Sequence, residues 1–179
     1  MFKRLLTFVF MLAACGAVSA RQPAAPAHIE SHLTQARLAG EGPFTWFGLK
    51  IYDAQLWVGQ KGYAPNEPFV LDLRYARKLN GVKIAEASAE QMEKVGAGTA
   101  AQRAAWLGRM KEIFPDVKEG TRISGVFLPA SGARFYLDGK PLASVPDPDF
   151  ARAFFAIWLD PKTTGRTLRT SLLKDAAPR

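Results

Sequence analysis

Short stretches of the chain alternate between apolar and polar residues, which is the pattern of β-strands that bury one face. The pattern becomes strand-like from Gln35, and Phe44–Val58 is rich in aromatic and β-branched residues, with Gly48 predicted as a bend or bulge. Phe69–Tyr75 alternates strictly and predicts a half-buried strand. In the first of these stretches, alternation gives one inner, apolar face to Tyr52, Ala54, Leu56 and Val58.

Later segments carry apolar residues at helical spacing or form further short strands. Helices are predicted over residues 84–95, 99–114, 149–159 and 164–174, and strands over residues 122–128 and 133–137. Asp147 and Asp149 at the start of the third helix are expected to cap it rather than to act as paired catalytic carboxylates. The order of strands, two helices, strands and two helices predicts an α+β fold, an antiparallel β-sheet with a layer of α-helices on one face.

The first twenty residues predict a signal peptide rather than a part of the fold. A cationic start, Met1–Arg4, precedes the unbroken apolar run Leu5–Ala14. Two processing sites fit the sequence: cleavage between Ala20 and Arg21, or lipidation of Cys15 at the end of a lipobox-like sequence. Both predict an exported, periplasmic protein, and the second would also tether it to a membrane through a lipid anchor.

Composition narrows the function classes further. Lys and Arg outnumber Asp and Glu by 24 to 16, but the charges are interspersed, which is typical of a solvated surface and gives no indication of nucleic-acid binding. A single cysteine and two histidines, His28 and His32, predict no metal site, and no cofactor-binding motif is found. Both histidines fall in residues 21–34, a Pro- and Ala-rich stretch predicted as a flexible linker before a domain at residues 35–175.

Five longer strings resemble the bacterial chalcone isomerase-like proteins. They are LKIYDAQLWVG at Leu49–Gly59, FVLDLRYARKLNG at Phe69–Gly81, the segment Ile84–Glu93, FPDVKEGTRISGVFLP at Phe114–Pro129, and FARAFFAIWLDPKTTGRTLR at Phe150–Arg169. The resemblance spans roughly residues 35–174. It implies a large antiparallel sheet with a layer of helices on one face and a ligand cleft between the two.

The resemblance carries over to function only in part. Plant enzymes of this fold cyclise a chalcone with the help of an Arg on a glycine-rich early strand, and non-catalytic relatives use that Arg and a later Tyr to hold a fatty-acid carboxylate. Here Pro43, after Gly40-Glu41-Gly42, stands where the Arg is expected, whereas Tyr52 matches the later Tyr. The enzyme's Tyr and Asn fall at Asn80 and Ala87. Chalcone cyclisation is therefore not expected.

These residues predict a non-catalytic binder of a small apolar anion, such as a fatty acid, in the cleft between sheet and helices. Tyr52 would anchor the ligand, with Lys50 or Arg122 as the anion partner and Trp46 and Tyr75 as contact surface. No catalytic residue is assigned. Apart from the lipid anchor, no contact with a membrane is expected.

Each candidate also has a purely structural interpretation. The aromatic residues and Trp158 fit a packed core, Lys50 fits a solvated sheet edge, and Arg122 fits an ion pair with Asp116 or Glu119. Two other functions therefore stay open: an isomerase or intramolecular lyase acting on a phenolic, flavonoid-like or enone substrate, and a structural envelope protein with a filled core.

Overall fold

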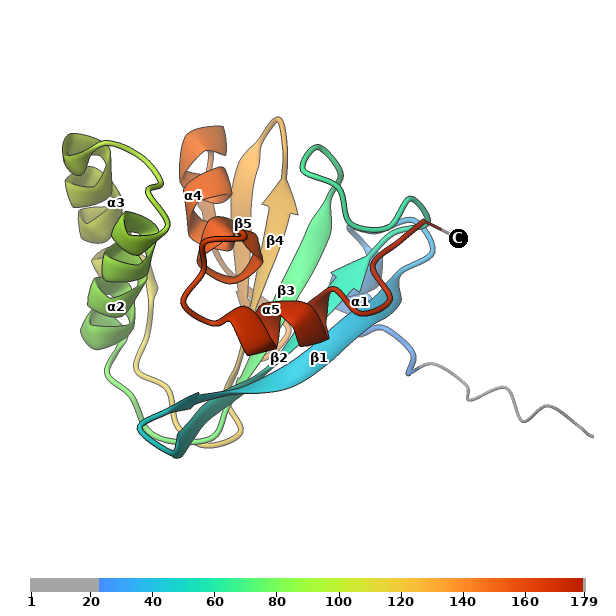
Figure 1. The fold of residues 1–179 in the computed structure, drawn as a ribbon, viewed down its shortest axis with the longest axis horizontal. Helices are drawn as coiled ribbons and strands as arrows, with labels where there is room; N and C mark the ends of the chain where they lie inside the picture. The colour runs from blue at the N-terminus through green and yellow to red at the C-terminus, as the bar shows by residue number, and fades with distance from the viewer. Residues whose placement is uncertain (1–22, 179) are drawn as a thin grey trace, which may run out of the picture.

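One six-stranded antiparallel sheet organises the computed structural model, which describes residues 23–178 (Figure 1). Each strand pairs with the next one in sequence, in the order β1 to β6. The strands are β1 (Arg37–Trp46), β2 (Leu49–Val58), β3 (Phe69–Tyr75), β4 (Arg122–Leu128), β5 (Gly132–Leu137) and β6 (Lys140–Val145). The strands predicted over residues 69–75 and 122–128 are confirmed.

Four of the five helices cover one face of this sheet (Figure 1). They are α2 (Gly81–Lys94), α3 (Ala100–Ile113), α4 (Pro148–Leu159) and α5 (Arg166–Leu172), and the short α1 (Ala27–Glu30) precedes the first strand. The predicted α+β architecture is therefore confirmed. None of the helices described between residues 23 and 178 is long and apolar enough to span a bilayer.

β1 and β2 form a hairpin, where the sequence had suggested a single bent strand. Phe47 and Gly48 make its two-residue turn, and both have positive φ angles, +48° and +76°. Positive φ at both central residues is the geometry of a type I′ turn, which matches the twist of the flanking strands. Gly48 thus reverses the chain completely, because its freedom at positive φ serves a turn rather than a bulge.

The main core lies between the sheet and the helices α2 to α5. The predicted inner face of β2 is confirmed, since Ala54, Leu56 and Val58 are fully buried there. Helix α4 fills the centre of this layer with a run of aromatic side chains, as its nearly continuous apolar sequence predicts. Asp147 caps α4 by accepting hydrogen bonds from the backbone N–H groups of Asp149 and Phe150, which confirms the predicted cap.

The outer face of the sheet is covered by the segment that the sequence predicted as a linker. Ile29 of α1 is fully buried, and Leu33 is nearly so. They cover a second apolar cluster formed by Trp57 of β2, Val70 of β3 and Val126 of β4. From residue 23 onward, the prediction of a flexible linker is therefore wrong, because four residues of helix give too little periodicity to recognise. The predicted signal peptide and Cys15 lie outside the described residues.

Both histidines bind the sheet rather than lying free on the surface. Ser124 donates its hydroxyl proton to Asp72 (2.6 Å), so the 2.9 Å contact between His28 Nε2 and Ser124 Oγ requires the imidazole to be the donor. His32 Nε2 lies 2.7 Å from the hydroxyl of Tyr136. Asp72 is buried beneath this segment, so β3 is buried on both faces and not half-buried as predicted.

Candidate functional site

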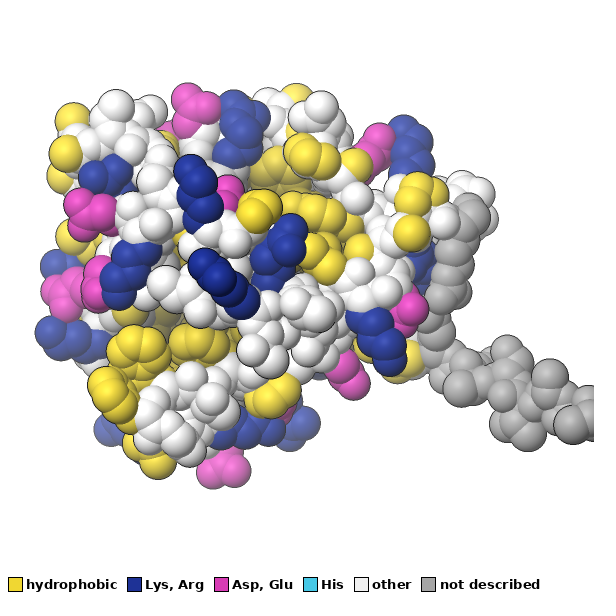
Figure 2. Space-filling view, in the orientation of Figure 1, with side chains coloured by type: hydrophobic (Ala, Val, Ile, Leu, Met, Phe, Trp, Pro, Cys, Tyr) yellow, Lys and Arg dark blue, Asp and Glu magenta, His cyan; other side chains and the backbone are white. Residues whose placement is uncertain are grey.

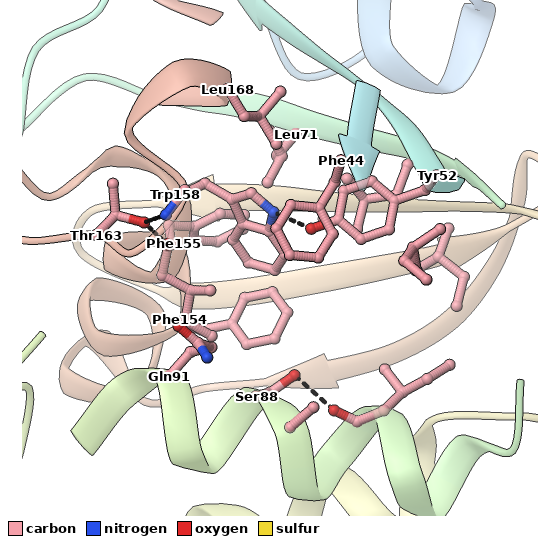
Figure 3. Close-up of a pocket in the computed structure, with 18 of the residues that line it drawn as sticks. Phe44, Tyr52, Leu71, Ser88, Gln91, Phe154, Phe155, Trp158, Thr163 and Leu168 are labelled. Atoms are coloured by element: carbon pink, nitrogen blue, oxygen red, sulfur yellow. Dashed lines mark hydrogen bonds between the residues drawn. The ribbon is translucent and has the colours of Figure 1, made fainter. Parts of the chain in front are cut away.

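A cavity of about 340 Å³ opens between the sheet and the helix layer (Figure 3). Its size falls in the range of small-molecule binding sites. The strands contribute inward-facing residues from β1 to β5, and the opposite wall comes from α2, α4, the loop before α5 and α5 itself. Most of the lining is aliphatic or aromatic, including Leu71, Leu73, Ile123, Phe154, Phe155 and Leu168.

Tyr52 and Trp158 join the two walls of this cavity. The indole Nε1–H of Trp158 donates a hydrogen bond to the Tyr52 hydroxyl over 2.9 Å (Figure 3). Phe44 stacks on the Tyr52 ring, with 5.1 Å between the ring centroids. The sequence placed Trp158 in the core and missed its place in the cavity wall, although the need of a buried indole N–H for an acceptor was a usable signal.

Tyr75 supplies a second phenol to the cavity, directly across the β2–β3 pair from Tyr52. The two rings meet edge to face at 5.8 Å. Among residues 23–178, no side chain or backbone group hydrogen-bonds the Tyr75 hydroxyl, although the residue is only 5% exposed. Burial raises the pKa of both phenols, so at neutral pH they are uncharged hydrogen-bond donors.

Among residues 23–178, the charged residues of the cavity lining come from α2 alone, and they lie at the mouth. Lys83 and Lys94 are exposed there, and each forms an ion pair with a neighbouring glutamate, Glu86 at 2.9 Å and Glu90 at 2.7 Å. These lysines were missed because the exposed face of a helix resembles any solvated surface. Their positions and those of Ala87, Glu90 and Gln91 follow helical spacing along one side of α2, which was the available signal.

One hydrogen bond crosses the mouth of the cavity. The Thr164 hydroxyl donates to Gln91 Oε1 over 2.6 Å, which links the loop before α5 to α2. Gln91 and Ser88 extend from α2 on the side that faces the aromatic wall (Figure 3). Trp46 lines the same mouth from β1 and is half exposed.

Lys50 does not reach the cavity. Phe44 pairs with Tyr52 and Thr45 with Lys50, so Ile51 is the extra residue of a β-bulge. Ile51 and Tyr52 consequently both line the cavity, and Lys50 is turned away. Lys50 is half exposed and forms an ion pair with Asp53 at 2.6 Å. Strict alternation across the bulge was the reason for the expected position of Lys50.

Arg122 lies on the opposite face of the sheet from the cavity. Its Nε is 2.7 Å from Asp72 Oδ2, so the partner is neither Asp116 nor Glu119. The next residue of β4, Ile123, faces the cavity instead. The structure therefore brings neither of the two expected cations to Tyr52.

The positions aligned with the enzyme's catalytic residues do not form a constellation. Asn80 is the N-cap of α2, where it accepts a hydrogen bond from Lys83 N and donates one to Asp116. Ala87 lines the cavity without a polar group, and Pro43 pairs with Asp53 within the sheet. Within residues 23–178, no cluster of three or more His, Cys, Asp or Glu side chains is arranged to hold a metal ion.

The chain belongs to the chalcone isomerase-like family, whose model matches residues 18–174. Its fold is similar to that of a fatty-acid binding protein of Arabidopsis thaliana, seen in a crystal structure, with a TM-score of 0.62. That match covers 79% of this chain and 88% of the plant protein, at 13% sequence identity. Among curated proteins, no sequence matches this chain.

Proposed function

We propose that this protein is a non-catalytic binder of a small amphipathic anion, with a fatty acid as the fitting ligand class. The observation that carries the proposal is the distribution of charge in the cavity: the interior is apolar, and the charged side chains of the described lining occur only at its mouth. An acyl chain matches the interior and a carboxylate matches the lysines at the mouth. The similar fold of a plant fatty-acid binding protein is consistent with this ligand class.

The proposed ligand lies with its tail inward. With Pro43 in place of the expected Arg, the described cavity interior holds no cation, and burying an unpaired carboxylate there would cost several kcal/mol. At the mouth, Lys83 and Lys94 can exchange their glutamate partners for a ligand carboxylate. Tyr52 contacts the acyl chain with its ring, and the Tyr75 hydroxyl offers a donor to an oxygen or a water molecule within the cavity.

The same lining favours binding over isomerase or lyase chemistry. A general base should have a pKa near the working pH, whereas burial moves the pKa values of Tyr52 and Tyr75 upward and away from it. The remaining ionisable lining residues, Lys83, Glu90 and Lys94, lie at the mouth, where water has access.

The proposal includes export to the periplasm. It rests on the cationic start and apolar run of residues 1–14 and on the two processing sites that follow them. If the chain is instead processed at Cys15, acylation of this cysteine would tether the protein to a membrane.

Native mass spectrometry tests the proposal on protein expressed from the full chain in an exporting host. A copurified acyl species is expected, and the measured mass of the polypeptide also identifies the processing site. Calorimetry with saturated fatty acids of increasing length should show affinity rising about fourfold per methylene until the cavity is full.

A matched pair of variants tests the orientation of the ligand. The double variant Lys83→Met and Lys94→Met should weaken binding of the acid but not of the corresponding alcohol, whereas Lys61→Met, in the β2–β3 loop, should change neither. Protein that is free of ligand and binds neither fatty acids nor flavonoids would contradict the proposal and favour a structural role.

A further inference from the structure

The tip of the β1–β2 hairpin exposes three large apolar side chains in a row. Trp46, Phe47 and Leu49 are 52%, 88% and 53% exposed, and in the described range only Val82 is a further large apolar residue with comparable exposure. Yellow side chains gather at the lower left of Figure 2, over this hairpin tip. Contiguous exposed apolar surface of this kind marks sites that meet another molecule or a membrane.

The backbone conformation at the hairpin tip is energetically unfavourable for Phe47. Phe47 adopts a φ of +48°, a conformation that bulky side chains rarely take. In the part of the chain that the structure describes, its ring contacts only that of Trp46, itself half exposed, edge to face at 5.0 Å. Asparagine followed by glycine is the preferred pair for this turn. A phenylalanine here thus stabilises neither the turn nor the core, which indicates a role outside the fold.

The tip is continuous with the mouth of the cavity, because Trp46 belongs to both. Whatever covers the tip therefore also lies at the cavity entrance. An apolar ligand that enters or leaves there passes along the tip.

Basic residues flank the tip. The backbone N–H of Ala76 donates to Ile51 O over 2.9 Å, which places the following Arg77 and Lys78 beside the tip end of the hairpin. Within residues 23–178, neither Arg77 nor Lys78 forms an ion pair, whereas Asp53, the nearby acid on β2, is neutralised by Lys50. An apolar tip with unpaired cations beside it is complementary to an anionic lipid surface.

We propose that the hairpin tip docks this protein on anionic lipid surfaces, with Phe47 and Leu49 entering the interface between headgroups and acyl chains. The inference deepens the proposed function, since it lets a lipid-derived ligand pass between a lipid phase and the cavity. A second copy of the chain fits less well. The three side chains expose on the order of 400 Å², about half of what each partner buries in a standard stable interface.

Vesicle co-sedimentation and tryptophan fluorescence test this proposal. The processed full chain is used in a Cys15→Ala background, so that no acyl anchor contributes. Binding to vesicles of phosphatidylcholine mixed with an equal amount of phosphatidylglycerol is expected, with weaker binding to phosphatidylcholine alone. The emission should shift to the blue, because Trp46 is half exposed while Trp57, Trp106 and Trp158 are buried.

Phe47→Asn separates docking from folding, because asparagine suits the turn and should raise the thermal midpoint. Together with Leu49→Ser it should lower vesicle binding at least fivefold and abolish the blue shift. Lys78→Glu should weaken binding to the vesicles that contain phosphatidylglycerol but not to those of phosphatidylcholine alone. Its matched control is Lys174→Glu, an exposed lysine that forms no ion pair with any described residue and lies at the opposite end of the sheet. That control should bind like the parent.

Three results would overturn the proposal: no vesicle binding by the parent, unchanged binding by the Phe47→Asn, Leu49→Ser variant, or an oligomer in solution that this variant dissociates. The last would identify the tip as a contact between copies. Binding of laurate in solution is measured in parallel and should be equal in parent and variant. If neither the parent nor the variant binds laurate, the proposed function is refuted and the docking result stays intact.

Discussion

Trp158 on α4 and Tyr52 on β2, 106 residues apart in the chain, are joined by a single hydrogen bond of 2.9 Å across the cavity wall. The bond fixes two large aromatic rings at the boundary between packed core and open space. Phe44 stacks on one of them and Phe154 packs edge to face against the other. One polar contact, supported by aromatic packing, therefore joins sheet and helix at this point of the cavity.

Tyr52→Phe should lower the free energy of unfolding by about 1–2 kcal/mol, because the Trp158 indole loses its acceptor in a largely apolar surrounding. Tyr75→Phe is the matched control, since it removes a phenol hydroxyl that has no protein partner among the described residues. Urea unfolding of both variants measures the difference. Equal losses of stability would show that the hydrogen bond contributes nothing specific.

Ala87→Trp should block the cavity without disturbing the fold. Ala87 is an exposed residue of α2 that lines the mouth, so a large side chain can fill the entrance from outside. Affinity for laurate should fall at least tenfold, while the thermal midpoint stays close to that of the parent. Ala104→Trp, on an exposed position of α3 outside the lining, should change neither quantity.

Gly40→Ala should destabilise the protein by about 1–3 kcal/mol through overpacking. A Cβ at this position of β1 would lie 2.0 Å from the carbonyl oxygen of Ser171 and 2.6 Å from that of Leu172, so α5 must move. Gly108→Ala, with open space around the added methyl in α3, should instead stabilise by about 0.5–1 kcal/mol. Opposite signs in urea unfolding are the expected result.

Acid should loosen the N-terminal segment. Desolvation lowers the pKa of both His28 and His32. For His28, Asp72 opposes this effect and Arg122 adds to it, and for His32 both Arg134 and His28 add to it. The unfolded chain therefore takes up protons first as pH falls below about 6.5, and the stability that these groups contribute above that pH is lost.

Unfolding in urea at pH about 7.5 and about 5.5 measures this dependence in the range where histidine titrates. The double variant His28→Gln and His32→Gln should show a smaller difference between the two pH values. Proteolysis between residues 23 and 35 should also speed up at the lower pH in the parent. An unchanged pH dependence in the double variant would assign the effect to other groups.

Local pattern was sufficient where apolar residues recur with the period of a strand or a helix. The alternation of Phe69–Tyr75 and the helical spacing over residues 99–114 and 149–159 predicted elements that the structure contains. Sequence reasoning failed at features that depend on strand register or on contacts with residues far away in the sequence. The bulge at Ile51 shifts Lys50 out of the cavity. The strand β6 was missed because Pro141 and a short length weaken its pattern.

The residues of the site also fall into those that local pattern could assign and those that it could not. Tyr52 and Tyr75 could be assigned to the inner face from period-two spacing alone, and the structure places both in the cavity. Lys83, Lys94 and Trp158 could not, since their roles depend on how α2 and α4 lie over the sheet. The buried α1 segment was also beyond local pattern, because Ile29 and Leu33 gain their partners only from strands that follow later.

The contacts of α1 also constrain the order of folding. His28 pairs with Ser124 and His32 with Tyr136, across 96 and 104 residues of intervening chain. The docking surface of this segment is therefore complete only after β4 and β5 have been synthesised and paired. The α1 segment therefore waits for strands that are made much later, and until it attaches Trp57 and Val126 stay exposed to chaperones and to other chains.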